Sequence, residues 1–98
     1  MHNIELKWDD KATGAFVIDE PEGRSAEMVF GISGEKMTVY HTEVADKHKG
    51  QGVAGQLFSK MVDYARQQNL QVLPRCAYVH AQFKRHPDQY SDIWNQHL

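Results

Sequence analysis

The stretch KHKGQGVAGQLF, residues 47–58, contains the feature that decides the fold. Glycines stand at 50, 52 and 55 beside basic residues, and an apolar helical pattern follows at once. Glycine weakens a helix, so three glycines at a helix start need a reason. A strand that passes through glycines into a helix leaves N–H groups unpaired at the positive end of the helix dipole, which binds anions. The alternative is a simple turn with a solvated basic rim.

Upstream of the glycines, the sequence alternates between apolar and polar residues as strands do. The pattern predicts strands in four runs, at residues 4–8, 16–18, 26–32 and 36–45. SGEK, residues 33–36, is typical of a short hairpin turn. We therefore expect an antiparallel meander before the glycine turn.

Downstream, apolar residues recur every three or four positions and predict an amphipathic helix over 53–69. LQVLPRCAYV, residues 70–79, is typical of a buried strand in which proline marks an edge, a bulge or the end. Short helices are predicted at 81–86 and 87–96. The predicted fold is α+β, a mostly antiparallel sheet with a central strand–glycine loop–helix–strand unit and short C-terminal helices.

Length and composition limit the possible functions. The 98 residues, 41% of them hydrophobic and 24% charged, predict a single globular domain over 1–98. A net charge of −2 argues against nucleic acid as a partner. A lone cysteine and the lack of a leading signal segment predict a cytoplasmic protein. No apolar run approaches the roughly 20 residues that span a membrane, so no membrane partner is expected.

Four short segments resemble the GNAT-type acetyltransferases, and in particular their small stand-alone branch. They are HTEV at 41–44, KGQGVA at 49–54, LPRCAYV at 73–79, and HP followed by Tyr at 86–90. The family loop reads Gln or Arg, two residues, Gly, one residue, and Gly or Ala; here Lys49, Gly52 and Ala54 occupy those positions. Four expected strands precede the loop, so it is not the opening turn of a Rossmann unit.

The resemblance implies acetyl-CoA as co-substrate and no metal. It implies that turn amides bind the diphosphate, from Gln51, Gly52, Val53, Ala54 and Gly55. It also implies that Gly50 shapes the loop, that Lys49 supplies a cation, and that Glu43 and Val44 offer strand backbone to the pantetheine arm. Lys47 and His48 could add charge for the diphosphate. The acceptor, a small molecule or a protein that presents an amine, is not implied.

Cys76 is the residue that could make the protein a covalent enzyme, because a thiolate can attack the thioester and hold the acetyl group. His41 is the predicted partner and Arg75 an adjacent cation; a lone cysteine is more often a small buried hydrophobe. Glu43 could instead be general base for an amine, or a surface acid paired with lysine. Strand alternation puts His41 and Glu43 on the face of Met37 if no bulge intervenes.

Two function classes stay open at this point. One is an acetyltransferase that acts directly or through a Cys76 thioester, and the other is a non-catalytic acyl-CoA-binding or protein-interaction module. The two classes share one cofactor site, and the presence of Cys76 with His41 favours an enzyme. Six histidines without H-E-x-x-H or CxxC spacing predict no metal site.

Overall fold

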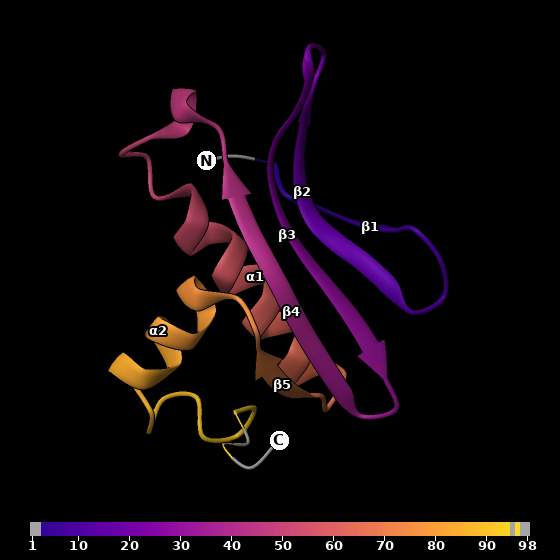
Figure 1. The fold of residues 1–98 in the computed structure, drawn as a ribbon, viewed down its shortest axis with the longest axis vertical. Coiled ribbons are helices and arrows are strands. Elements are labelled where there is room, and N and C mark those ends of the chain that lie inside the picture. Colours follow the sequence, from indigo (N-terminus) through magenta and orange to yellow (C-terminus); the bar gives the residue numbers. More distant parts are fainter. Residues whose placement is uncertain (1–2, 95, 97–98) are drawn as a thin grey trace.

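A five-stranded sheet in the order β1-β2-β3-β4-β5 forms the centre of the fold (Figure 1). The computed structural model describes residues 3–94 and 96. The strands are β1 (Glu5–Trp8), β2 (Thr13–Glu20), β3 (Gly23–Ser33), β4 (Lys36–Val44) and β5 (Gln71–Pro74). The first four strands pair antiparallel, and β5 pairs parallel with β4. The predicted α+β fold with a mostly antiparallel sheet is therefore confirmed.

The helices lie beside β4 and behind the sheet (Figure 1). After β4 come a short 3-10 helix, η1 (Asp46–His48), and α1 (Val53–Gln67), which packs on β2, β3 and β4. The second helix, α2 (Ala77–Arg85), contacts β4 and β5. The predicted glycine turn between strand and helix is confirmed, and α1 ends two residues before the predicted limit of 69.

The core joins the apolar stripe of α1 to one face of the sheet. Met28, Phe30 and Val39 of the sheet and Leu57 and Met61 of α1 are fully buried. In the sequence, the apolar residues of the strands recur every two positions and those of the helix every three or four, and these spacings predicted the strands and α1. Burying each such side chain contributes about 1.5–3 kcal/mol, so this packing fixes α1, and with it the glycine turn, against β4.

A β-bulge at Tyr40 changes which residues of β4 face the core. The register runs from His41 opposite Val29 to Val39 opposite Phe30, so Tyr40 is an extra residue on β4. Side chains alternate, and the extra residue inverts the alternation beyond it. The predicted alternation held only if no bulge intervened; a bulge is present, and His41 and Glu43 face away from the side of Met37.

The predicted strand over 70–79 is too long, because β5 ends at Pro74. Proline cannot donate to a strand ladder, and Cys76 begins α2 as its N-cap residue. Val79 and Phe83, four residues apart, are both buried, which is the period of a helix and not of a strand. The predicted helix at 81–86 is therefore the second half of a longer one.

The predicted helix at 87–96 does not form over the described residues, because other elements take its backbone groups. The chain makes turns over 87–93, and Trp94 forms a parallel bridge with Val72. The Val72 N–H donates to the Ile93 carbonyl over 2.6 Å, and Arg66 donates to the Gln89 carbonyl over 2.8 Å. Asn95, inside the predicted helix, lies outside the described residues.

Candidate functional site

The glycine turn presents unpaired amides at the start of α1. Gly50 and Gly52 have φ angles of +80° and +72°, a left-handed conformation that favours glycine. Gly52 is the N-cap of α1, and no side chain in the described part of the chain caps it through a hydrogen bond. The N–H groups of the first helical turn, from Val53 to Gly55, have no intrahelical acceptor. Together with the helix dipole, this geometry suits an anionic ligand.

The basic residues before the turn have different environments. The Lys47 ammonium forms ion pairs with Glu20 and Glu22, the latter at 2.7 Å. These carboxylates raise the pKa of Lys47, with Glu20 the larger influence. His48 is buried, whereas Lys49 is exposed at the turn. Lys47 and His48 therefore connect the turn to the sheet, and Lys49 is the member of the basic trio that a phosphate can reach without displacing those contacts.

A length of β4 has an open edge beside the turn (Figure 1). Lys36 to Val39 pair with β5, which ends at Pro74, while β4 continues to Val44. The Ala45 N–H donates to the Ser25 carbonyl over 2.8 Å, on the β3 side. Since antiparallel backbone groups alternate in direction, those of Val44 point to the open edge and those of Glu43 point to β3. The predicted backbone role of Val44 suits this geometry, and that of Glu43 does not.

Cys76 lies where β4 and β5 separate. Its N–H donates to the Val39 carbonyl over 2.9 Å, and its Sγ lies 3.3 Å from Thr42 Oγ1. The residue is 6% exposed and is the N-cap of α2. The sulfur therefore lies at the N-terminus of α2 with the Thr42 hydroxyl beside it.

His41 does not meet Cys76, contrary to the expected pairing. The bulge turns His41 to the other face of β4, where its Nε2 lies 2.9 Å from Glu27 Oε2. The His41 ring is the main cause that lowers the pKa of Glu27. Glu43 pairs across the strands with Glu27 on this same face. The structure therefore brings His41 and Glu43 together and separates both side chains from Cys76.

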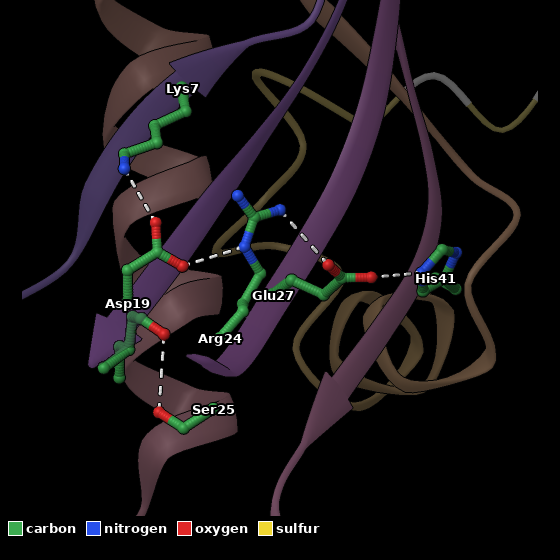
Figure 2. A network of polar contacts seen from close by, with 7 residues as sticks. Lys7, Asp19, Arg24, Ser25, Glu27 and His41 are labelled. Carbon is green, nitrogen blue, oxygen red and sulfur yellow. Dashed lines mark hydrogen bonds and ion pairs between the residues drawn. The ribbon is translucent and has the colours of Figure 1, made fainter. Parts of the chain in front are cut away.

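The sheet face opposite α1 carries a ladder of charged side chains (Figure 2). It crosses four strands through contacts at 2.7 Å between Lys7 and Asp19, 2.9 Å between Asp19 and Arg24, 3.4 Å between Arg24 and Glu27, and 2.9 Å between Glu27 and His41. His41 is the last member of this ladder. The position of the His41 side chain is therefore explained by its contact with Glu27 on the charged face of the sheet.

Thr42 and Tyr78 are site residues that sequence reasoning did not select as candidates for the chemistry. Thr42 faces Cys76 only because of the bulge, for which the alternating pattern has no signal. A Cβ built on Gly55 would lie 3.8 Å from Tyr78 Oη, which places this phenol beside the first turn of α1. Burial raises the pKa of Tyr78. The missed α2 helix concealed this neighbour.

A cavity of about 600 Å³ opens next to the turn. It is lined by the turn and α1, through Gly52, Gly55, Gln56, Ser59, Lys60 and Asp63, and by Asn3 and Ile4 near the N-terminus. A ligand held at the turn thus has room along α1 on one side and an open strand edge on the other.

Neither a metal-binding cluster nor a membrane-spanning helix occurs among the described residues, 3–94 and 96. They contain no group of three histidine, cysteine, aspartate or glutamate side chains arranged to hold a metal ion. Neither of their α-helices combines the length and the apolar character needed to cross a membrane.

Comparisons with known structures identify the same architecture. A GCN5-like protein from Staphylococcus aureus is 26% identical, with a TM-score of 0.68 over 97% of this chain and 91% of that one. The ribosomal-protein-alanine N-acetyltransferase from Brucella melitensis is 19% identical, with a TM-score of 0.61 over 88% of this chain and 64% of that one. Tetrahymena GCN5 is 18% identical, with a TM-score of 0.60 over 78% and 51%. The last two show similarity of fold alone.

Family membership rests on the sequence. No curated protein matches the chain. The family model described as GCN5-related N-acetyl-transferase matches residues 15–93, which include β4, the glycine turn, α1, Cys76 and α2. The chain therefore belongs to the GCN5-related N-acetyltransferase family, as the resemblance of its motifs predicted.

Proposed function

We propose that this protein transfers the acetyl group of acetyl-CoA to an amine. The observation that carries the proposal is the order of three features along one edge of β4: the glycine turn, the open strand at Val44, and Cys76 where β5 ends. A binding site for an acyl-CoA needs three features in spatial order. They are an anion site for the diphosphate, hydrogen-bond donors and acceptors for the amides of the pantetheine arm, and a reactive group beside the thioester. Family membership supports the same co-substrate.

The turn amides suit the diphosphate. Gly50 and Gly52 adopt left-handed φ angles that lead the chain into α1, whose first-turn N–H groups have no intrahelical acceptor. The Lys49 ammonium is placed to attract the diphosphate. At contact distance, solvent ions screen this attraction only partly. The proposed diphosphate contacts are Gly52, Val53, Ala54 and Gly55, with Lys49 at the rim. The Gln51 N–H, which the resemblance also implied, donates instead to the His48 carbonyl. The backbone of Val44 is the proposed partner of the pantetheine amides.

Cys76 is the proposed nucleophile. Its sulfur, as thiolate, attacks the acetyl carbonyl carbon, the carbon–sulfur bond to CoA breaks, and CoA leaves as a thiolate that takes up a proton. The amine then attacks the Cys76 thioester, loses a proton, and regenerates the thiolate. The N-cap position in α2 and the Thr42 hydroxyl support this role in place of the expected His41.

Glu43 is the proposed general base for the amine. Its carboxylate is exposed on the face of β4 opposite Cys76, next to the open edge, and would accept through a water the proton of an amine that approaches from that face. The same group would serve a direct transfer from acetyl-CoA, in which Cys76 takes no part. The two routes differ in a single observable, the acetyl group on the cysteine.

Mass spectrometry tests the proposal. Wild-type protein is incubated with acetyl-CoA, and native and denaturing spectra are recorded together. We expect a CoA adduct in the native spectrum and an acetyl increment on the peptide that contains Cys76 after denaturation. Cys76→Ala should keep the adduct and lose the increment, while Cys76→Ser controls for side-chain volume.

The remaining outcomes separate the alternatives. Labelling that persists in Cys76→Ala removes this residue from the mechanism. An adduct without labelling, but with acetylation of added amines, indicates direct transfer. An adduct without labelling or turnover indicates the non-catalytic acyl-CoA-binding module, and the absence of any adduct contradicts the turn assignment.

A further inference from the structure

His48 is a buried polar residue directly before the glycine turn. It ends η1, is 6% exposed, and contacts both the sheet and the turn. Its Nε2 lies 2.9 Å from Ser25 Oγ on β3, and its Nδ1 lies 3.2 Å from Gln51 Oε1. The ring thus bridges the centre of the sheet and the middle of the turn.

Gln51 completes the connection. Its side-chain Nε2 donates to the Lys47 carbonyl over 3.2 Å, and its backbone N–H donates to the His48 carbonyl over 3.1 Å. The turn between Lys47 and Gln51 is therefore closed by one backbone bond and by two bonds of a single side-chain amide. Glycine restricts the backbone little, so Gly50 and Gly52 do not by themselves hold the turn in one conformation. These hydrogen bonds must do so.

The contacts determine which ring nitrogen carries a proton. The Lys47 carbonyl only accepts, so the Gln51 atom that faces it is the donating nitrogen, and Oε1 faces His48 Nδ1. An amide oxygen also only accepts, so Nδ1 must bear a hydrogen. Glu20 Oε1 lies 3.7 Å from Nε2, beyond hydrogen-bond distance, and Ser25 is the closer partner. Nδ1 keeps its proton whichever group receives the Ser25 hydroxyl hydrogen.

From these contacts we infer that His48 is a positioning residue for the glycine turn, acting through Gln51. By donating from Nδ1, it holds the Gln51 amide and thereby the direction of the turn N–H groups that meet the diphosphate. The inference rests on the proposed function of the turn. A histidine that merely filled space beside Ser25 would have no need of a bond to a side chain in the turn.

The ring tautomer gives a test that does not depend on a ligand. Two-bond proton–nitrogen correlation spectra of ¹⁵N-histidine protein distinguish protonated from unprotonated ring nitrogens. We expect Nδ1 of His48 to be protonated in the wild type, and this preference to disappear in Gln51→Ala. An Nε2-only ring in the wild type, or a ring unaffected by Gln51→Ala, overturns the inference.

Two substitutions of His48 test its two hydrogen bonds separately. An asparagine nitrogen superimposes on Nδ1 and a glutamine nitrogen on Nε2, so His48→Asn keeps the link to Gln51 and His48→Gln keeps the link to Ser25. For CoA binding measured by calorimetry, His48→Gln should weaken affinity about five- to tenfold and His48→Asn less than about twofold. The Tm of each variant is measured in parallel.

A double-mutant cycle completes the test. In the Gln51→Ala background, His48→Gln should cause no further loss of affinity, because the group through which His48 acts is gone. Equal losses in His48→Gln and His48→Asn, or a loss that persists in the Gln51→Ala background, overturn the inference. Failure of the wild type to bind CoA overturns the proposed function instead, and the tautomer still reveals whether the bridge exists.

Discussion

Cys76 Sγ lies 3.3 Å from Thr42 Oγ1, in the gap that opens where β5 ends. Two distant features create this contact. The bulge at Tyr40 turns Thr42 toward the core, and Pro74 ends β5 so that Cys76 can begin α2. The Thr42 hydroxyl and the N-terminus of α2 therefore both lie beside the sulfur.

Thr42→Val is expected to slow acetyl labelling of Cys76 about tenfold and to leave CoA binding unchanged, because it removes one hydrogen bond to the sulfur at nearly constant volume. Stopped-time labelling followed by mass spectrometry measures the rate. Thr42→Ser retains the hydroxyl and is the matched control. Equal rates in wild type and Thr42→Val would show that the hydroxyl plays no part.

The two glycines flanking the start of α1 should respond to alanine in opposite ways. Gly52→Ala forces a side chain into a φ of +72° and should reduce the free energy of unfolding by about 1–2 kcal/mol. Gly55 is helical, and a Cβ there would meet only Tyr78 Oη, at an ordinary contact distance of 3.8 Å. Gly55→Ala should therefore raise the free energy of unfolding by up to about 1 kcal/mol. Urea denaturation measures both variants.

Gly55→Ala should nevertheless weaken CoA binding, because it adds a methyl group at a residue whose N–H is a proposed diphosphate contact. Higher stability with lower affinity would separate the needs of the fold from those of the site. Unchanged affinity in Gly55→Ala would contradict the diphosphate assignment at this residue.

The charged ladder predicts acid sensitivity. Lys7 first, and Arg24 after it, hold the pKa of Asp19 below its usual range. A carboxyl group with a lower pKa in the folded state contributes stability that is present above the unfolded pKa of about 4 and lost as the pH falls through the folded value. Asp19→Asn should therefore flatten the loss of stability below about pH 4, and added salt should weaken the effect.

Denaturant midpoints of wild type and Asp19→Asn at a series of pH values measure this prediction. Glu35→Gln, in the hairpin between β3 and β4, is the control for removing a carboxylate elsewhere. Parallel pH curves for wild type and Asp19→Asn would mean that the ladder contributes nothing to acid unfolding.

Glu43→Gln should leave labelling of Cys76 unchanged, because the two side chains lie on opposite faces of β4. Acetylation of an added amine should slow about 100-fold if the carboxylate takes the amine proton. The two rates are measured in one experiment, with Glu35→Gln as control. A loss of labelling in Glu43→Gln would place Glu43 in the first step, and an unaffected amine rate would remove it from the second.

Local signals in the sequence predicted most of the fold. Alternation placed the first four strands, the three-to-four period placed α1, and the residues at 33–36 predicted the hairpin that Gly34, with a φ of +61°, closes. The glycines between β4 and α1 identified the anion-binding geometry. These features depend on neighbours within a few residues, and the sequence contains those neighbours.

The relations among the candidate catalytic residues could not be read in the same way. Strand alternation placed His41 on the face of Met37, but one extra residue, Tyr40, inverts the alternation of β4, so that Thr42 and not His41 faces Cys76. Helical spacing predicted a last helix. In the structure, β5 and Arg66 form hydrogen bonds with backbone carbonyls of this segment, which adopts turns instead. Such outcomes depend on partners distant in the chain.

The sequence by itself thus determined the first four strands, α1, the glycine turn and the family, because periodicity, turn residues and motifs are local properties of the chain. Only the tertiary structure decided that Cys76 begins a helix beside Thr42, that Lys47 pairs with the β2–β3 hairpin, and that His48 bridges Ser25 and Gln51. The physical reason is that strand register and the competition for hydrogen-bond partners are settled when distant segments pack together.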